Sequence, residues 1–156
     1  MRAISLWQPW ASAVAMGSKT IETRHWSTDY RGPLAIHAAK HWTSAIARMI
    51  HLQERWDAAL NNGNPIPAPA KSFFQFGCVV AVCQLEGCCP TEEMRNIDFR
   101  RVANGLTWSE REMGDYSPGR FAWILKDIRP LKTPLRWKGG QSFFQVDDAR
   151  IQEALR

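Results

Sequence analysis

The chain has 156 residues, of which 20 are Lys or Arg and 15 are Asp or Glu, so its formal net charge is +5. Its length suits one domain over residues 1–156, and its 45% hydrophobic and 22% charged content excludes wholesale disorder. No apolar run approaches the roughly 18–20 residues of a membrane span, which excludes a transmembrane protein. The N-terminus carries no long apolar segment typical of secretion, so we expect a cytoplasmic protein with no membrane partner.

In the first half of the chain, predicted strands and helices follow one another closely. Residues 3–6 predict a short strand and residues 10–16 a helix, which begins after a proline and ends at a glycine. Two further strands are predicted over residues 20–24 and 34–39. Apolar residues at helical spacing then predict one longer helix over residues 43–61, which ends at an Asn-Asn-Gly turn.

In the second half, strands dominate. The predicted elements are a buried strand over 77–85, a polar excursion over 91–119, strands over 121–128 and 142–146, and a short C-terminal helix capped by Asp147 or Asp148. A polar excursion of this length is typical of a lid. About six strands with two to three flanking helices, not regularly interleaved, favour an α+β fold built on a small β-barrel.

Neither a metal nor a nucleotide cofactor is predicted. The four cysteines lie within twelve residues (78–89) but form no C-x-x-C pair, so a zinc site lacks its second ligand pair, and we expect buried, reduced thiols. The chain also lacks the G-x-G-x-x-G and G-x-x-x-x-G-K-[ST] sequences that bind dinucleotides and phosphates.

Tryptophan and positive charge point to a class of partner. The chain has eight Trp, and residues 120–138 hold six basic residues and one acidic residue, which accounts for the whole net charge. Aromatic faces beside positive charge suit a flat anionic partner such as RNA or a nucleotide. A Trp-rich core and a solvated basic surface would have the same composition.

One short segment combines three charged side chains. Residues 17–24 read Gly-Ser-Lys-Thr-Ile-Glu-Thr-Arg, and strand alternation places Glu22 and Arg24 on the same face, about 7 Å apart. A carboxylate flanked by two cations stays ionised and holds both of them. We expect a net positive site with Lys19 or Arg24 free to meet a phosphate or carbonyl, or an ion-pair cluster that only stabilises the fold.

This segment resembles a known family. Gly17, Lys19, Glu22 and Arg24 match the G-x-K-x-x-E-x-R signature of the activating-signal-cointegrator homology (ASCH) family, within the superfamily of PUA-like domains. Other segments resemble further parts of the family in the same order: residues 5–10, 31–40, 77–82, 121–125, and 138–140 with 144–146. The resemblance implies a PUA-like β-barrel, a cleft beside the first helix lined by the signature residues, and RNA binding.

The resemblance also implies an enzymatic alternative. Some members resemble enzymes that act on RNA or on modified nucleosides, and the acetylcytidine amidohydrolases use Lys-x-x-Thr with Thr as nucleophile. Glu22 stands where that Thr would be, so this mechanism does not carry over. A ribonuclease or nucleoside hydrolase would instead use Lys19 and Glu22, with Glu22 as a general base on water. A third alternative is a protein-interaction domain that uses residues 91–119, and the oligomeric state stays open.

Other side chains are candidates for ligand contacts. Trp7 and Trp10 flank the predicted cleft and can stack on a base, and Gln8 can read a base edge through its amide. Arg129 and Lys138 belong to the basic stretch, which would run along the phosphates. The Gly-Gly pair after Lys138 forms an anion-binding turn or simply a turn. His37 is a candidate general base and Ser142 a weak candidate nucleophile, because no base is visible beside it.

Overall fold

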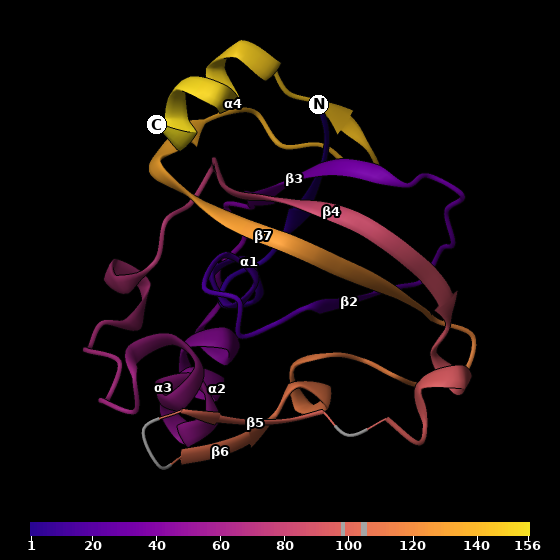
Figure 1. Cartoon of the computed structure of the whole chain (residues 1–156). Helices are drawn as coiled ribbons and strands as arrows, with labels where there is room; N and C mark the ends of the chain where they lie inside the picture. Colours follow the sequence, from indigo (N-terminus) through magenta and orange to yellow (C-terminus); the bar gives the residue numbers. More distant parts are fainter. Residues whose placement is uncertain (98, 104–105) are drawn as a thin grey trace.

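The computed structural model describes residues 1–97, 99–103 and 106–156, which form an α+β fold around a six-stranded mixed sheet (Figure 1). The sheet has the strand order β2-β7-β4-β3-β1-β8, and only β1 and β3 are parallel. Its strands are β1 (Arg2–Leu6), β2 (Ile21–Arg24), β3 (Gly32–Ala38), β4 (Cys78–Pro90), β7 (Phe121–Arg136) and β8 (Phe144–Gln145). The predicted α+β class is confirmed.

The predicted barrel closure is wrong. Within the described residues, β2 and β8 are the two edges of the sheet and are not hydrogen-bonded to each other. Closure requires every strand to have two neighbours, whereas β8 pairs with β1 through only two residues, Phe144 and Gln145. The sheet therefore stays open, with β2 and β8 as its edges.

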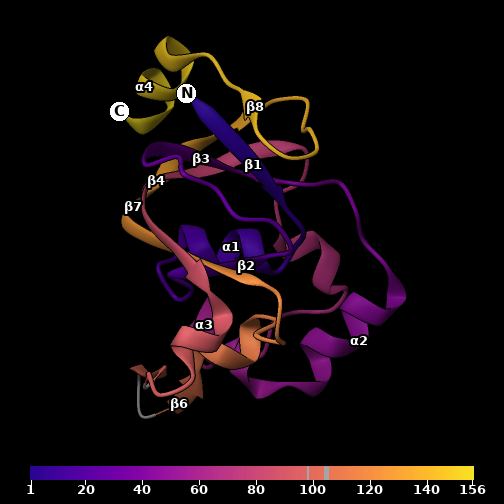
Figure 2. The same cartoon turned by 90° about the vertical axis from the view of Figure 1, so that its right-hand side faces the viewer.

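Two short helices cover opposite faces of the sheet. The alternation of side chains in β1 places Ile4 on the face covered by α1 (Trp10–Ala15) and Ala3 on the face covered by α4 (Asp148–Leu155). Trp123 and Val14 belong to the first core, and Ile151 belongs to the second. In Figure 2, α4 lies at one end of the molecule near both termini.

The predicted helix over residues 43–61 forms two helices, α2 (Ser44–Leu52) and α3 (Glu54–Asn61). Gln53 lies between them with an extended backbone, and its side-chain Oε1 accepts hydrogen bonds from Trp56 Nε1 at 3.1 Å and Arg55 Nη2 at 2.7 Å. The apolar spacing continues across the break, which is why periodicity alone predicts one helix. The break lets Trp56 enter a core shared with residues of α2.

The 91–119 excursion leaves the main sheet and folds into a hairpin. Its strands are β5 (Arg100–Ala103) and β6 (Leu106–Ser109), and a 3-10 turn follows over Glu110–Met113. Both figures place the hairpin near α3, at the opposite end of the molecule from α4. Glu110 fastens the excursion to β2, because its buried carboxylate accepts hydrogen bonds from the backbone N–H groups of Thr20 and Ile21.

Among the described residues, no helix combines the length and the apolar character needed to cross a membrane. All four cysteines are free thiols: Cys78 and Cys83 are buried, whereas Cys88 and Cys89 are half-buried.

Candidate functional site

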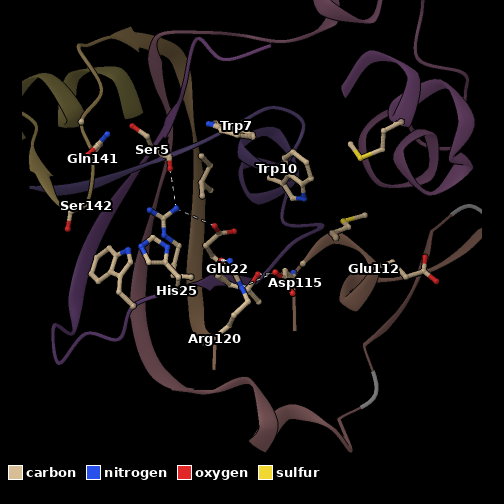
Figure 3. Close-up of a pocket in the computed structure, with 18 of the residues that line it drawn as sticks. Ser5, Trp7, Trp10, Glu22, His25, Glu112, Asp115, Arg120, Gln141 and Ser142 are labelled. Atoms are coloured by element: carbon tan, nitrogen blue, oxygen red, sulfur yellow. Dashed lines mark hydrogen bonds and ion pairs between the residues drawn. The ribbon is translucent and has the colours of Figure 1, made fainter. Parts of the chain in front are cut away.

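A cavity of about 980 Å³ opens beside the start of α1. It is lined by the end of β1, the start of α1, β2 and the residues after it, Met49 and Trp56 of α2 and α3, residues 112–115, Arg120, and the 140–142 loop. Figure 3 shows side chains from these distant segments converging on one space. We call it the Glu22 cavity. Its volume is at the upper end of the range typical of small-molecule sites.

Glu22 is held between two cations. Lys19 Nζ lies 3.5 Å from its Oε2, and Arg24 Nη1 lies 3.6 Å from its Oε1. The alternation of β2 directs Glu22 and Arg24 to the same side, as predicted, while Ile21 packs with Ala122 and Met94 on the other side. Glu22 and Arg24 line the cavity, and Lys19 does not.

The cations around the Glu22 carboxylate also make contacts within the protein. Lys19 is completely buried and also donates to the carbonyl of Ile21, while Arg24 also donates to the carbonyl of Ser5 at 3.3 Å. Arg120, which also lines the cavity, lies 3.3 Å from Asp115. Lys19 and Arg24 share the one carboxylate of Glu22, so the charges of these three side chains still sum to +1, but each of the three cations has an acidic partner.

Asp115 and Arg120 form the wall contributed by the excursion. Hydrogen bonds from Ser117, and then the charge of Arg120, lower the pKa of the Asp115 carboxyl. The backbone N–H of Asp115 donates to Thr23 Oγ1 at 3.0 Å, which fixes this wall to β2. Arg120 also donates to the carbonyl of Thr23 at 3.2 Å.

Aromatic rings form much of the remaining wall. Trp7 is 51% exposed and stacks on His41 with ring centroids 3.8 Å apart, so one face of its indole is supported from behind. Trp10 meets Trp56 edge to face at 5.8 Å, and Trp26 meets Trp123 in the same way at 4.6 Å. Four of these rings, those of Trp7, Trp10, Trp26 and Trp56, line the cavity.

Two other predicted contacts lie away from it. Gln8 is completely buried: its Nε2 donates to the carbonyl of Gln75 at 2.8 Å, and its Oε1 accepts from the N–H of Ser12 at 3.0 Å. Gln8 thus stabilises the first turn of α1 and does not present its amide to a ligand. Arg129 is exposed on β7 and lines neither this cavity nor the one described next.

A second cavity, of about 790 Å³, adjoins the first. Lys138 and His37 line it, and it shares Ser5, Trp7 and the 140–141 loop with the Glu22 cavity. We call it the Lys138 cavity. Of the two weaker candidates, His37 therefore belongs to this second cavity, whereas Ser142 lines the first.

Sequence reasoning missed several residues of the site. His25, Asp115 and Gln141 line the Glu22 cavity but belong to no motif, and Ser5 also lines it but is only part of the opening segment that resembles the family. Asp115 follows a segment without periodicity, and Gln141 follows the Gly-Gly turn, which is the one signal that could have drawn attention to it. Among the described residues, no three His, Cys, Asp or Glu side chains gather in a group that could hold a metal.

Fold and site together define an α+β domain with an aromatic, charge-paired cavity beside its first helix. The chain matches the family model described as "ASCH domain" over residues 4–134, so it belongs to the ASCH domain family. No curated protein matches the chain.

Solved structures agree on the fold. The chain is similar to ASCH from Zymomonas mobilis, with 17% identity and a TM-score of 0.53 over 97% of this chain and 91% of that one. A single-residue variant of the same protein gives 17% identity and a TM-score of 0.53, over 97% and 94% of the two chains. At this identity the likeness concerns the fold alone.

Proposed function

We propose that this protein binds RNA or a nucleotide, with a base in the Glu22 cavity. The observation that carries the proposal is the combination of four tryptophans with a fixed carboxylate and two arginines around one space. Planar rings of this kind stack on bases at about 1–3 kcal/mol per base. The half-exposed indole of Trp7, supported by His41, is a preformed platform for such stacking.

The polar groups of the cavity suit the edge of a base. The Glu22 carboxylate accepts hydrogen bonds, and Lys19 and Arg24 hold it in one place. A base that presents N–H groups would donate to it, whereas a phosphate would be repelled by it. The paired charges of this cavity therefore favour the base over the phosphate as its occupant.

Hydrolysis by Lys19 and Glu22 has less support. Lys19 is completely buried beneath Glu22 and already contacts the carbonyl of Ile21. A catalytic group must reach the reacting atoms of its substrate, and Lys19 does not line the cavity. Binding therefore explains the arrangement with fewer assumptions than turnover does.

A titration followed by Trp fluorescence tests the proposal. Single-stranded RNA octamers of each base and the four ribonucleosides would be added to the wild type, to Trp7→Ala and to Trp7→Phe. We expect Trp7→Ala to weaken binding by roughly 5- to 150-fold, from the loss of about 1–3 kcal/mol of stacking. Trp7→Phe should retain most of the affinity.

A control variant separates stacking from a general loss of apolar surface. Leu52 is 73% exposed on α2 and lines neither cavity, so Leu52→Ala should leave the affinity unchanged. Absence of binding to every RNA and ribonucleoside by the folded wild type would refute the proposal.

A further inference from the structure

The Lys138 cavity differs in charge from its neighbour. Three cations line it, Lys40, Arg136 and Lys138, and no Asp or Glu is among the residues that line it. None of the three makes an ion pair with a described residue, although Arg136 donates to the carbonyl of Phe76 at 3.0 Å. Unpaired cations around a concave space attract an anion.

The floor of this cavity is neutral and rigid. His37 is buried, and its Nε2–H donates to the carbonyl of Trp137 at 3.1 Å, so its Nδ1 accepts from the Ser5 hydroxyl, also at 3.1 Å. Burial, together with the charge of Lys40, lowers the pKa of His37, although the bond to Trp137 opposes this shift. The positive charge of the cavity therefore comes from its lysines and arginine.

The turn after Lys138 forms the wall above that floor. A Cβ atom at Gly139 would lie 2.5 Å from His37 Cε1 and 2.8 Å from Ser5 Oγ, so the backbone approaches both side chains as only glycine allows. Within the part of the chain that the structure describes, the N–H groups of Gly139 and Gly140 donate to no protein acceptor. Such free N–H groups complement an anionic oxygen.

The two cavities share a wall. Ser5, Trp7, Gly140 and Gln141 line both of them, so the two cavities adjoin beside the Trp7 indole. One cavity offers aromatic rings and a carboxylate, and the other offers unpaired cations. A nucleotide has the same division, with a base at one end and a phosphate at the other.

We propose that the Lys138 cavity is the phosphate subsite of this protein, and that its partner is a nucleotide unit with its base in the Glu22 cavity. The inference rests on the proposed function and adds which group occupies the second cavity. It assigns the phosphate contacts to Lys40, Arg136 and Lys138. It also excludes Arg129 from these contacts, since Arg129 lies outside both cavities.

Calorimetric titration tests the assignment with three probes: the four ribonucleosides, their 3′- and 5′-monophosphates, and inorganic phosphate. The variant Lys40→Gln/Lys138→Gln removes two cavity cations. The matched control Lys126→Gln/Arg129→Gln removes two exposed cations of β7 that line neither cavity. All substitutions lie at exposed positions, and circular dichroism would verify that each variant folds.

In the wild type, we expect a monophosphate to bind at least tenfold more tightly than its nucleoside at low salt. The cavity variant should lose this advantage and keep the affinity for the nucleoside, while the control should keep both. Equal binding of nucleoside and monophosphate by the wild type, or an equal loss in the control, would overturn the phosphate subsite alone. Absence of binding to every nucleoside, nucleotide and RNA octamer would overturn the proposed function as well.

Discussion

Lys19 and Glu22 form an ion pair beneath the cavity, with Lys19 Nζ 3.5 Å from Glu22 Oε2 and no exposed surface on Lys19. This relationship makes Lys19 a positioning residue. It holds Glu22 from below while Arg24 holds the same carboxylate from the side. The signature segment therefore builds a fixed acceptor for a ligand, and Lys19 does not reach the ligand itself.

Replacing one partner of the Lys19–Glu22 ion pair should destabilise the folded protein. Lys19→Met leaves Glu22 without its buried counter-charge, and removal of one partner of a buried pair destabilises a protein by roughly 3–5 kcal/mol. We expect a loss at the low end of this range in urea denaturation, because Arg24 still contacts Glu22.

The double variant Lys19→Met/Glu22→Gln provides the control. It removes both charges, so it should recover part of the lost stability. A single variant as stable as the wild type would contradict the account of Lys19 as the buried partner of Glu22.

The attachment of residues 91–119 to β2 should depend on Glu110. Glu110→Ala leaves the buried N–H of Ile21 without its 2.6 Å acceptor and removes the acceptor of Thr20 as well. An unsatisfied buried donor costs about 1–3 kcal/mol. We expect a loss of roughly 3 kcal/mol, with faster proteolysis within residues 91–119 and faster hydrogen exchange at the Ile21 amide.

Glu112 is the matched control in the same 3-10 turn. Its side chain is 54% exposed and pairs with Arg55 at 3.1 Å, and surface pairs of this kind contribute at most about 1 kcal/mol. Glu112→Ala should thus leave proteolysis within 91–119 unchanged. Equal sensitivity in the two variants would show that Glu110 has no special role in fastening residues 91–119 to β2.

The local sequence pattern is enough to predict several strands and the charged face of β2. Strand alternation is enough to place Glu22 and Arg24 on one face, and apolar runs locate β3 and β4. The depth of Lys19 does not follow from the sequence, because it depends on packing beneath the strand. The wall with Asp115 also escapes prediction, since a polar segment carries no periodic signal.

Long-range arrangement escapes prediction for a related reason. The parallel pairing of β1 with β3 and the open edge between β2 and β8 depend on contacts between distant segments. Local propensity is silent about such contacts. The Lys138 cavity likewise joins β3, the end of β7 and the 138–141 turn, although the basic residues and the Gly-Gly pair are visible in the sequence.

Protonation of His37 should contribute to the pH dependence of the free energy of unfolding. Burial lowers the pKa of His37 in the folded protein. As the pH falls, the imidazole of His37 is therefore protonated in the unfolded chain before it is protonated in the folded protein. The contribution of neutral His37 is complete above the ordinary His pKa of about 6.5 and is lost as the pH falls from there towards the lower folded value.

His37→Gln isolates this contribution. A glutamine amide can donate to the Trp137 carbonyl and accept from the Ser5 hydroxyl, and it does not titrate. Urea denaturation of both proteins between pH 8 and pH 5 should show a smaller loss for the variant. Parallel curves would mean that His37 has the same pKa in the folded and unfolded states.

The backbone of Gly139 closely approaches the side chains of His37 and Ser5. Gly139→Ala places a methyl group 2.5 Å from His37 Cε1, so the 138–141 turn must move away from β1 and β3. We expect a loss of about 1–3 kcal/mol, as for overpacked sites, and a weaker affinity for monophosphates. Gly140→Ala is the control, because its Cβ meets Phe144 Cβ at 3.1 Å and requires a shift of only a few tenths of an ångström. If Gly139→Ala were as stable as Gly140→Ala and bound monophosphates as the wild type does, the turn would not be a fixed wall of the Lys138 cavity.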